Sequence, residues 1–125
     1  LHERITPGFL DVFERFGRDV DELSDIVYGL DASLRIAYVN QGWMRAAQAV
    51  PGFCPEEWSL GRPVLDAVRG PLRELYGHWL HESSVHQQGW EQLYQCPAPD
   101  KQRTFWMKVI PVGDGRLLVV HALKQ

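Results

Sequence analysis

The sequence predicts an α+β domain with a five-stranded antiparallel sheet, helices on one face of that sheet, and an amphipathic helix in front of it. Three observations predict this class. Five short segments have the alternation and β-branched content of strands, apolar residues at helical spacing mark the helices, and clusters of Gly, Pro and Asp separate the segments. A chain of 125 residues is long enough for one such domain and too short for two.

The first element is an amphipathic helix that runs from Thr6-Pro7 to Ser24. Threonine followed by proline is a typical helix start, because proline at the first helical position gives up no hydrogen bond. The apolar residues recur at helical spacing: Phe9, Val12, Phe13, Phe16, Val20 and Leu23. This apolar stripe needs a surface to pack against.

The next element is a β-hairpin with strands at Ile26–Leu30 and Leu34–Val39. The turn formers Asp31-Ala32-Ser33 lie between the two strands. Asn40 follows directly, where its side chain can accept a backbone N–H and begin a helix that ends before Pro51-Gly52.

Helices and three further strands complete the chain. We expect one helical turn at Pro55–Trp58 and a long helix from Pro71 to about Gln87. Three strands follow at Trp90–Cys96, Arg103–Val112 and Arg116–Leu123. The helices between the second and third strands must cross one face of the sheet, which leaves a cavity between sheet and helices.

The hairpin with Asp31 in its turn and Asn40 at the helix start resembles the opening of a PAS domain, a small sensory module. The order of elements matches that family over residues 25–123. The resemblance implies an N-terminal helix over residues 1–24 and a PAS domain over residues 25–125. It also implies a larger signalling protein, such as a histidine kinase, a cyclic-di-nucleotide enzyme or a transcription regulator, whose effector domain would lie in the same chain.

The sequence departs from the PAS pattern in two informative places. Flavin-binding blue-light sensors of this family carry a Gly-Arg-Asn-Cys run, and Gly61-Arg62-Pro63-Val64 resembles that loop with Val64 in place of the reactive cysteine. We therefore expect no flavin–cysteine photochemistry. Many PAS domains end their last strand with an Asp-x-Thr motif that couples the domain to a following helix. Residues 121–125 do not contain this motif, so the sequence does not predict coupling of that kind.

Haem is the cofactor alternative that the resemblance raises. His78 precedes Gly89 by a spacing similar to that of haem-binding PAS domains, so His78 is the candidate ligand to iron. The helical phase argues against this, because the apolar stripe carries His86, while His78 lies on its flank and His81 points away. No spacing of His residues predicts a zinc site.

Aromatic side chains are the best indication of a ligand site. Trp79, Trp90 and Trp106 lie on the helix and strands that frame the expected cavity, which predicts a pocket for an apolar or aromatic ligand. The candidate polar groups in the same cavity are Tyr38, His86, Gln92 and Tyr94. Ordinary core packing of the aromatic rings is the alternative.

The resemblance also bears on assembly. Helices that precede PAS domains pack either on their own sheet or against a second copy. We expect a homodimer through Phe9, Phe13, Phe16 and Val20, with packing on the same domain as the alternative.

Composition excludes several other classes. With 13 basic and 16 acidic residues and a net charge of −3, the chain has no basic stripe for nucleic acid. No apolar run approaches the length of a membrane span, and two cysteines fit a reducing, cytoplasmic setting. No catalytic motif is present. Two alternatives to a ligand sensor remain: a ligand-free PAS dimerisation module and a small cone-shaped α+β enzyme.

Overall fold

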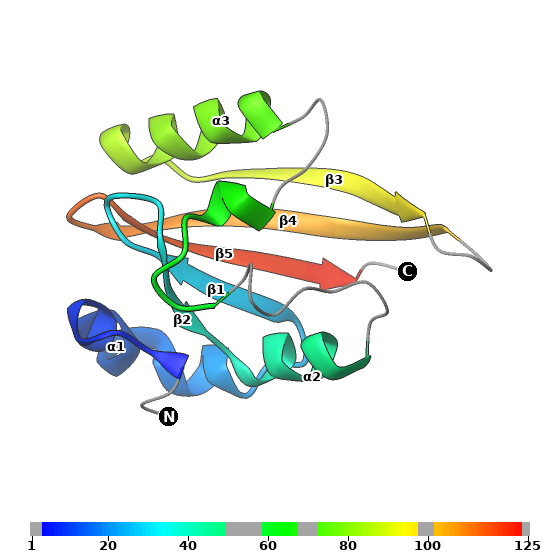
Figure 1. The fold of residues 1–125 in the computed structure, drawn as a ribbon, viewed down its shortest axis with the longest axis horizontal. Coiled ribbons are helices and arrows are strands. Elements are labelled where there is room, and N and C mark those ends of the chain that lie inside the picture. Colours follow the sequence, from blue (N-terminus) through cyan, green and yellow to red (C-terminus); the bar gives the residue numbers. More distant parts are fainter. Residues whose placement is uncertain (1–3, 50–58, 68–72, 98–101, 124–125) are drawn as a thin grey trace.

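A five-stranded antiparallel sheet runs through the middle of the molecule in the order β2-β1-β5-β4-β3 (Figure 1). The computed structural model describes residues 4–49, 59–67, 73–97 and 102–123. The strands are β1 (Ile26–Leu30), β2 (Ile36–Val39), β3 (Trp90–Pro97), β4 (Gln102–Gly113) and β5 (Arg116–Leu123). The helices are η2 (Pro7–Phe9), α1 (Leu10–Asp21), α2 (Gln41–Ala49), η3 (Val64–Ala67) and α3 (Arg73–His86).

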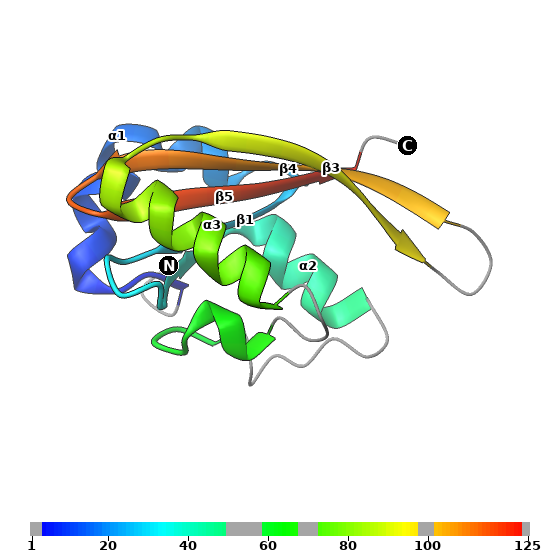
Figure 2. The ribbon, with the colours of Figure 1, turned by 90° about the horizontal axis from the view of Figure 1, so that it is seen from above.

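Helices cover both faces of the sheet (Figure 2). α2, η3 and α3 lie on one face, here called the inner face, and α1 lies on the other, the outer face. Each face has its own hydrophobic core. The inner core contains Tyr28, Leu30, Ile36, Val39, Trp43, Val64, Leu80, Met107, Val109, Leu117 and Val119. The outer core contains Ile5, Phe9, Val12, Val27, Ala37, Tyr38, Val112 and Leu118.

These elements confirm the α+β class and most of the expected order. The expected helix at Pro71–Gln87 is α3, and the last three strands lie where alternation placed them, within a residue at each end. The expected turn at Pro55–Trp58 lies outside the described residues. Among the described residues, no helix is long and apolar enough to cross a membrane.

The hairpin turn is two residues longer than expected. Leu34 adopts a positive φ of 60°, and β2 therefore begins at Ile36 rather than at Leu34. The Asp31 carboxylate accepts the backbone N–H groups of Ser33 and Arg35 at 2.9 and 3.0 Å, so the side chain itself closes the turn.

Asn40 does more than begin helix α2. Its Oδ1 accepts the N–H of Trp43 at 2.8 Å, as expected of a helix cap, and also the N–H of Val27 at 3.0 Å. Its Nδ2 donates to the carbonyls of Val20 and Asp25, both at 3.0 Å. This fully buried amide thus joins the end of α1, strand β1 and helix α2.

The N-terminal helix differs from the expectation in its start, and it packs on the protein's own sheet, which was the alternative to a dimer. Thr6 makes no side-chain cap, and a short 3-10 turn, η2, precedes α1. The ring of Phe9 lies directly over Gly29 of β1, where any Cβ would collide with it. Phe9 is 1% exposed, so its side chain is buried against the protein's own sheet.

The other three residues of the expected dimer surface differ in their exposure. Phe13 packs edge-on against Tyr38, with ring centroids 5.8 Å apart, and Val20 packs against the outer core. Phe16 alone among the four predicted residues is largely exposed, at 44%. The apolar stripe is used on the protein's own sheet because the outer face of β1 and β2 would otherwise face water.

A candidate ligand pocket between helix α3 and strand β3

The candidate site is an open pocket of about 340 Å³ between α3 and β3. This volume lies at the small end of the range for ligand sites. One helix and the strand that follows it supply its walls. The lining residues are His78, Trp79, Glu82, Ser83, Gln88, Gly89, Trp90 and Gln92.

Two tryptophans form adjacent walls of this pocket. The ring centroids of Trp79 and Trp90 are 5.2 Å apart and their planes are inclined by 62°. Tyr76 supports the far side of Trp79 in a nearly perpendicular contact at 5.6 Å. Contacts of this edge-to-face kind fix the ring orientations.

Trp90 also carries an unusual polar atom. Its indole Nε1 is buried, and no hydrogen-bond acceptor lies within reach among the residues that the structure describes. A buried N–H without a partner costs free energy, and in native proteins such a group generally has an explanation in a bound water or ion, in strain or in function.

The polar groups of the pocket come mainly from α3 and the loop after it. Glu82 supplies a carboxylate that is 49% exposed and lies 3.9 Å from His86 Nε2. Gln88 and Gln92 supply amides, and Ser83, 3% exposed, supplies a hydroxyl. These groups can orient a small molecule that rests on the two indoles.

The loop between α3 and β3 is held in place by its own backbone and by the β4–β5 turn. Gln87 ends the helix with a φ of 51°, in the left-handed region. Its side-chain Oε1 accepts the Gly113 N–H at 2.7 Å, and Ser84 Oγ donates to the Gly115 carbonyl at 2.6 Å. Gly89 then passes so near the Val109 carbonyl that a Cβ would lie 2.8 Å from its oxygen.

The structure brings four of the sequence-predicted residues together. Trp79, Trp90, Gln92 and His78 all line the pocket. Glu82 and Gln88, which no sequence pattern marks as ligand contacts, join them. The side chain of Tyr94 lies outside the described part of the structure.

Three predicted ligand contacts lie elsewhere. His86, expected on the buried stripe of α3, is 59% exposed at the last position of the helix and faces Glu82 rather than the pocket. Trp106 lies on the outer face, because Met107 and Val109 beside it take the inner one, and its Nε1 donates to Glu91 at 2.8 Å.

Tyr38 is the third. It lies under α1 in the outer core, and its hydroxyl donates to Asp21 at 2.7 Å. A register shift in the β1–β2 pairing is the cause, because it turns both Ala37 and Tyr38 toward α1 while Ile36 and Val39 face inward.

Asp21 is a buried carboxylate that the sequence pattern did not reveal. Besides Tyr38 it accepts from Arg4 and from Gln41. Burial alone would raise the pKa of Asp21, but the hydrogen bonds from Arg4, Tyr38 and Gln41 outweigh burial and hold the pKa below its ordinary value. Burial raises the pKa of Tyr38, and so do its hydrogen bond to Asp21 and the negative charge of that residue. This cluster fastens the end of α1 to β2 and α2.

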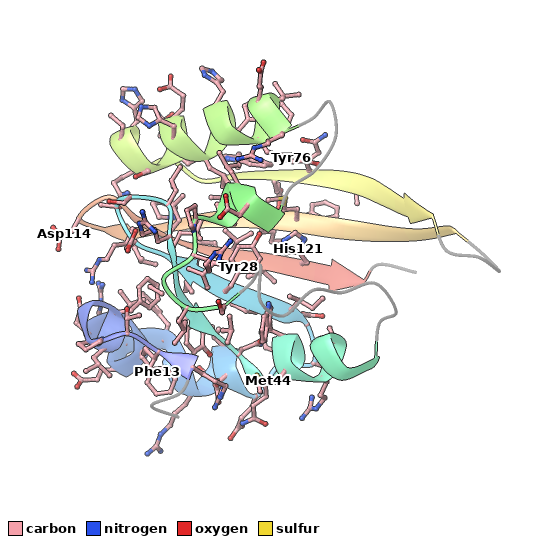
Figure 3. The ribbon with its side chains drawn as sticks, in the orientation of Figure 1. Phe13, Tyr28, Met44, Tyr76, Asp114 and His121 are labelled. Atoms are coloured by element: carbon pink, nitrogen blue, oxygen red, sulfur yellow. The ribbon has the colours of Figure 1, made fainter. Side chains whose placement is uncertain are left out.

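A second polar pair lies on the inner face of the sheet. Tyr28 of β1 and His121 of β5 lie side by side there, with the hydroxyl 3.0 Å from His121 Nε2 and the rings stacked at 5.4 Å (Figure 3). Burial lowers the pKa of His121 to about 4, so the imidazole is neutral at pH 7. Alternation along β5 could have placed His121 here, since Leu117 and Val119 share its face.

The residues present do not fit a haem. His78 lines an open pocket, and the space between α3 and the sheet is filled by Leu80 and Val109, with Tyr76 and Trp90 packed against them. Val64, at the position of the flavin-reactive cysteine, is buried in the same core and has no thiol.

Comparison with solved structures identifies the architecture. The chain superposes on the PAS domain of BvgS from Bordetella pertussis with a TM-score of 0.68, at 14% sequence identity, over 92% of this chain and 88% of that one. The chain has the PAS fold. Neither a family model nor a curated protein sequence matches it.

Other solved PAS-fold structures are similar. The PAS domain of the quorum-sensing receptor RpfR from Cronobacter turicensis, in complex with BDSF, has a TM-score of 0.60 at 16% identity, over 85% of this chain and 99% of that one. The PAS domain of an HTR-like protein from Haloarcula marismortui has a TM-score of 0.56 at 19% identity, covering 93% and 94% of the two chains. The resemblance to PAS domains is thus confirmed at the level of the fold.

Proposed function

We propose that this PAS-fold chain is a sensory module of a signal-transduction protein, and that it binds a small molecule in the pocket between α3 and β3. One observation carries the proposal: two inclined tryptophans line an open pocket, and the buried Nε1 of one of them has no acceptor among the described residues. The similarity to the PAS domain of a quorum-sensing receptor supports the sensory role.

A continuous set of polar contacts offers a route from the pocket to α1. The end of α3 holds the β4–β5 turn through Ser84 and Gln87. Arg116, the first residue of β5, then donates to the Gly8 carbonyl at 3.0 Å and to Asp11 at 2.6 Å. A ligand that favours one position of α3 would bias this route by its difference in affinity for the two arrangements.

Native mass spectrometry of the freshly purified domain, together with intrinsic tryptophan fluorescence, tests the proposal. We expect a bound small molecule, or a fluorescence change on adding ligand, in the wild type. Trp79→Leu should abolish it, while Trp106→Leu, on the opposite face, should not. Loss of binding in both variants, or in neither, would contradict the assignment of the site.

A ligand-free dimerisation module is the second candidate, favoured by exposed apolar side chains on the outer face. Leu10 and Phe16 of α1 are 41% and 44% exposed, and Leu93 and Ile110 of β3 and β4 are 46% and 44% exposed. Light scattering of Phe16→Asp tests it, since a dimer through α1 would fall to half its mass. An unchanged mass removes α1 from the interface. We propose no catalytic step in this chain.

A further inference from the structure

The charge of the pocket is one-sided. Among the described residues that line it, Glu82 is the one carboxylate, and Lys and Arg are absent from this lining. The nearby His86 lies 3.9 Å from the Glu82 carboxylate and outside the lining. An anionic ligand would therefore meet a like charge with no lysine or arginine among the described lining residues, and a cationic ligand would meet an opposite charge.

The walls of the pocket favour the same sign of ligand. The faces of indole rings carry negative charge density and attract cations, tryptophan more strongly than any other residue. Trp79 and Trp90 both line the pocket and meet edge to face, with planes inclined by 62° and centroids 5.2 Å apart, so each ring covers part of the other while both border the pocket. Two inclined aromatic walls with a carboxylate at the rim suit an alkylated ammonium group, which is too weakly hydrated to need many hydrogen bonds.

We infer that the pocket between α3 and β3 binds a small organic cation, with an alkylated ammonium group against Trp79 and Trp90 and its charge facing Glu82. This inference rests on the proposed function, since it names the ligand class of that same pocket. The volume of about 340 Å³ suits a compact molecule. The amides of Gln88 and Gln92 can bind a polar tail on such a ligand.

The test compares choline with 3,3-dimethyl-1-butanol, which has the same shape without the charge. Binding is measured by tryptophan fluorescence and by the shift of Tm. We expect choline to bind at least about tenfold more tightly than the neutral alcohol. In Glu82→Gln this preference should shrink severalfold, and in Trp79→Leu both compounds should lose binding. Glu74→Gln, an exposed change on the same helix outside the pocket, should behave as the wild type.

The outcomes separate this inference from the proposed function. Equal binding of the two compounds, or an unchanged preference in Glu82→Gln, overturns the cation assignment and leaves a ligand pocket. If choline does not bind but native mass spectrometry finds a neutral or anionic molecule that Trp79→Leu releases, the inference fails and the proposed function holds. If no compound binds and none is carried through purification, both fail.

Discussion

Arg116 of β5 holds both carboxylate oxygens of Asp11 on α1, with distances of 2.6 and 2.9 Å. The two residues are 105 positions apart in the chain. The hydrogen bonds from Arg116 lower the pKa of Asp11 to about 2, so the pair stays charged down to strongly acidic solution. The contact fastens the first turn of α1 to the tip of the β4–β5 hairpin.

Arg116→Ala should therefore loosen α1 without unfolding the sheet. We expect faster amide hydrogen exchange in residues 8–15, because the Gly8 carbonyl and Asp11 lose their partner together. Arg62→Ala is the matched control, since it removes an exposed pair with Asp66 far from α1. Unchanged exchange in α1 would show that apolar packing alone holds the helix.

Asn40→Ala should be strongly destabilising. It leaves the buried N–H of Val27 and the capping N–H of Trp43 without their acceptor, and it frees two carbonyls. We expect a loss of about 2–4 kcal/mol in the free energy of unfolding, measured by urea denaturation. Asp31→Ala, which removes an exposed turn contact, should cost about 1 kcal/mol or less. Similar losses in the two variants would contradict the central role of Asn40.

Gly29→Ala should destabilise the contact between η2 and β1. The added methyl would lie 2.4 Å from the Phe9 ring, so the ring must shift from its place in the outer core. We expect a cost of about 1–3 kcal/mol in thermal or urea unfolding. Gly8→Ala, where a Cβ meets nothing within 4 Å, is the control. Adding Phe9→Leu to the Gly29 variant should recover part of the loss, and failure to do so would place the strain elsewhere.

His121 predicts a specific pH dependence of stability. Its pKa falls from 6.5 in the unfolded chain to about 4 in the folded protein. As the pH falls, the unfolded state therefore binds the proton first. The contribution of His121 to the free energy of unfolding is fully present above pH 6.5 and is lost as the pH falls from 6.5 to 4. The total is about 3 kcal/mol.

Urea unfolding of the wild type and of His121→Gln at several pH values between 7.5 and 4 measures this effect. The variant should show a flatter profile over that window, since glutamine does not titrate and can still reach the Tyr28 hydroxyl. Parallel profiles would assign the pH dependence to other groups.

Local patterns predicted the strands well, because alternation and turn chemistry are properties of a few neighbouring residues. Asn40 was predictable for the same reason. The side of the sheet on which an individual side chain lies was harder to predict. A single register shift between Gly29 and Leu30 reverses the side on which Tyr38 lies, and no feature of the strand sequence reveals a shift in pairing.

The pocket shows the same limit. Trp79 and Trp90 were predictable as its aromatic walls, since they lie on adjoining elements of the expected fold. Glu82 is an exposed residue of α3 that no motif distinguishes in the sequence, and the pocket opens beside it. The position of the loop at Gln87 decides which exposed residues border the pocket. Contacts from the β4–β5 turn, distant in the sequence, determine that position.

In the proposed sensory role, the hydrogen bonds at that turn would couple the pocket helix and α1 in both directions. Gln87 and Ser84 tie one end of the pocket helix to the hairpin, and Arg116 ties the same hairpin to α1. Thermodynamic reciprocity requires that any factor by which a ligand changes the docking of α1 is also the factor by which the docking of α1 changes the Kd of the ligand. A neighbouring domain that displaces α1 would then change the Kd of the ligand, as well as respond to ligand binding.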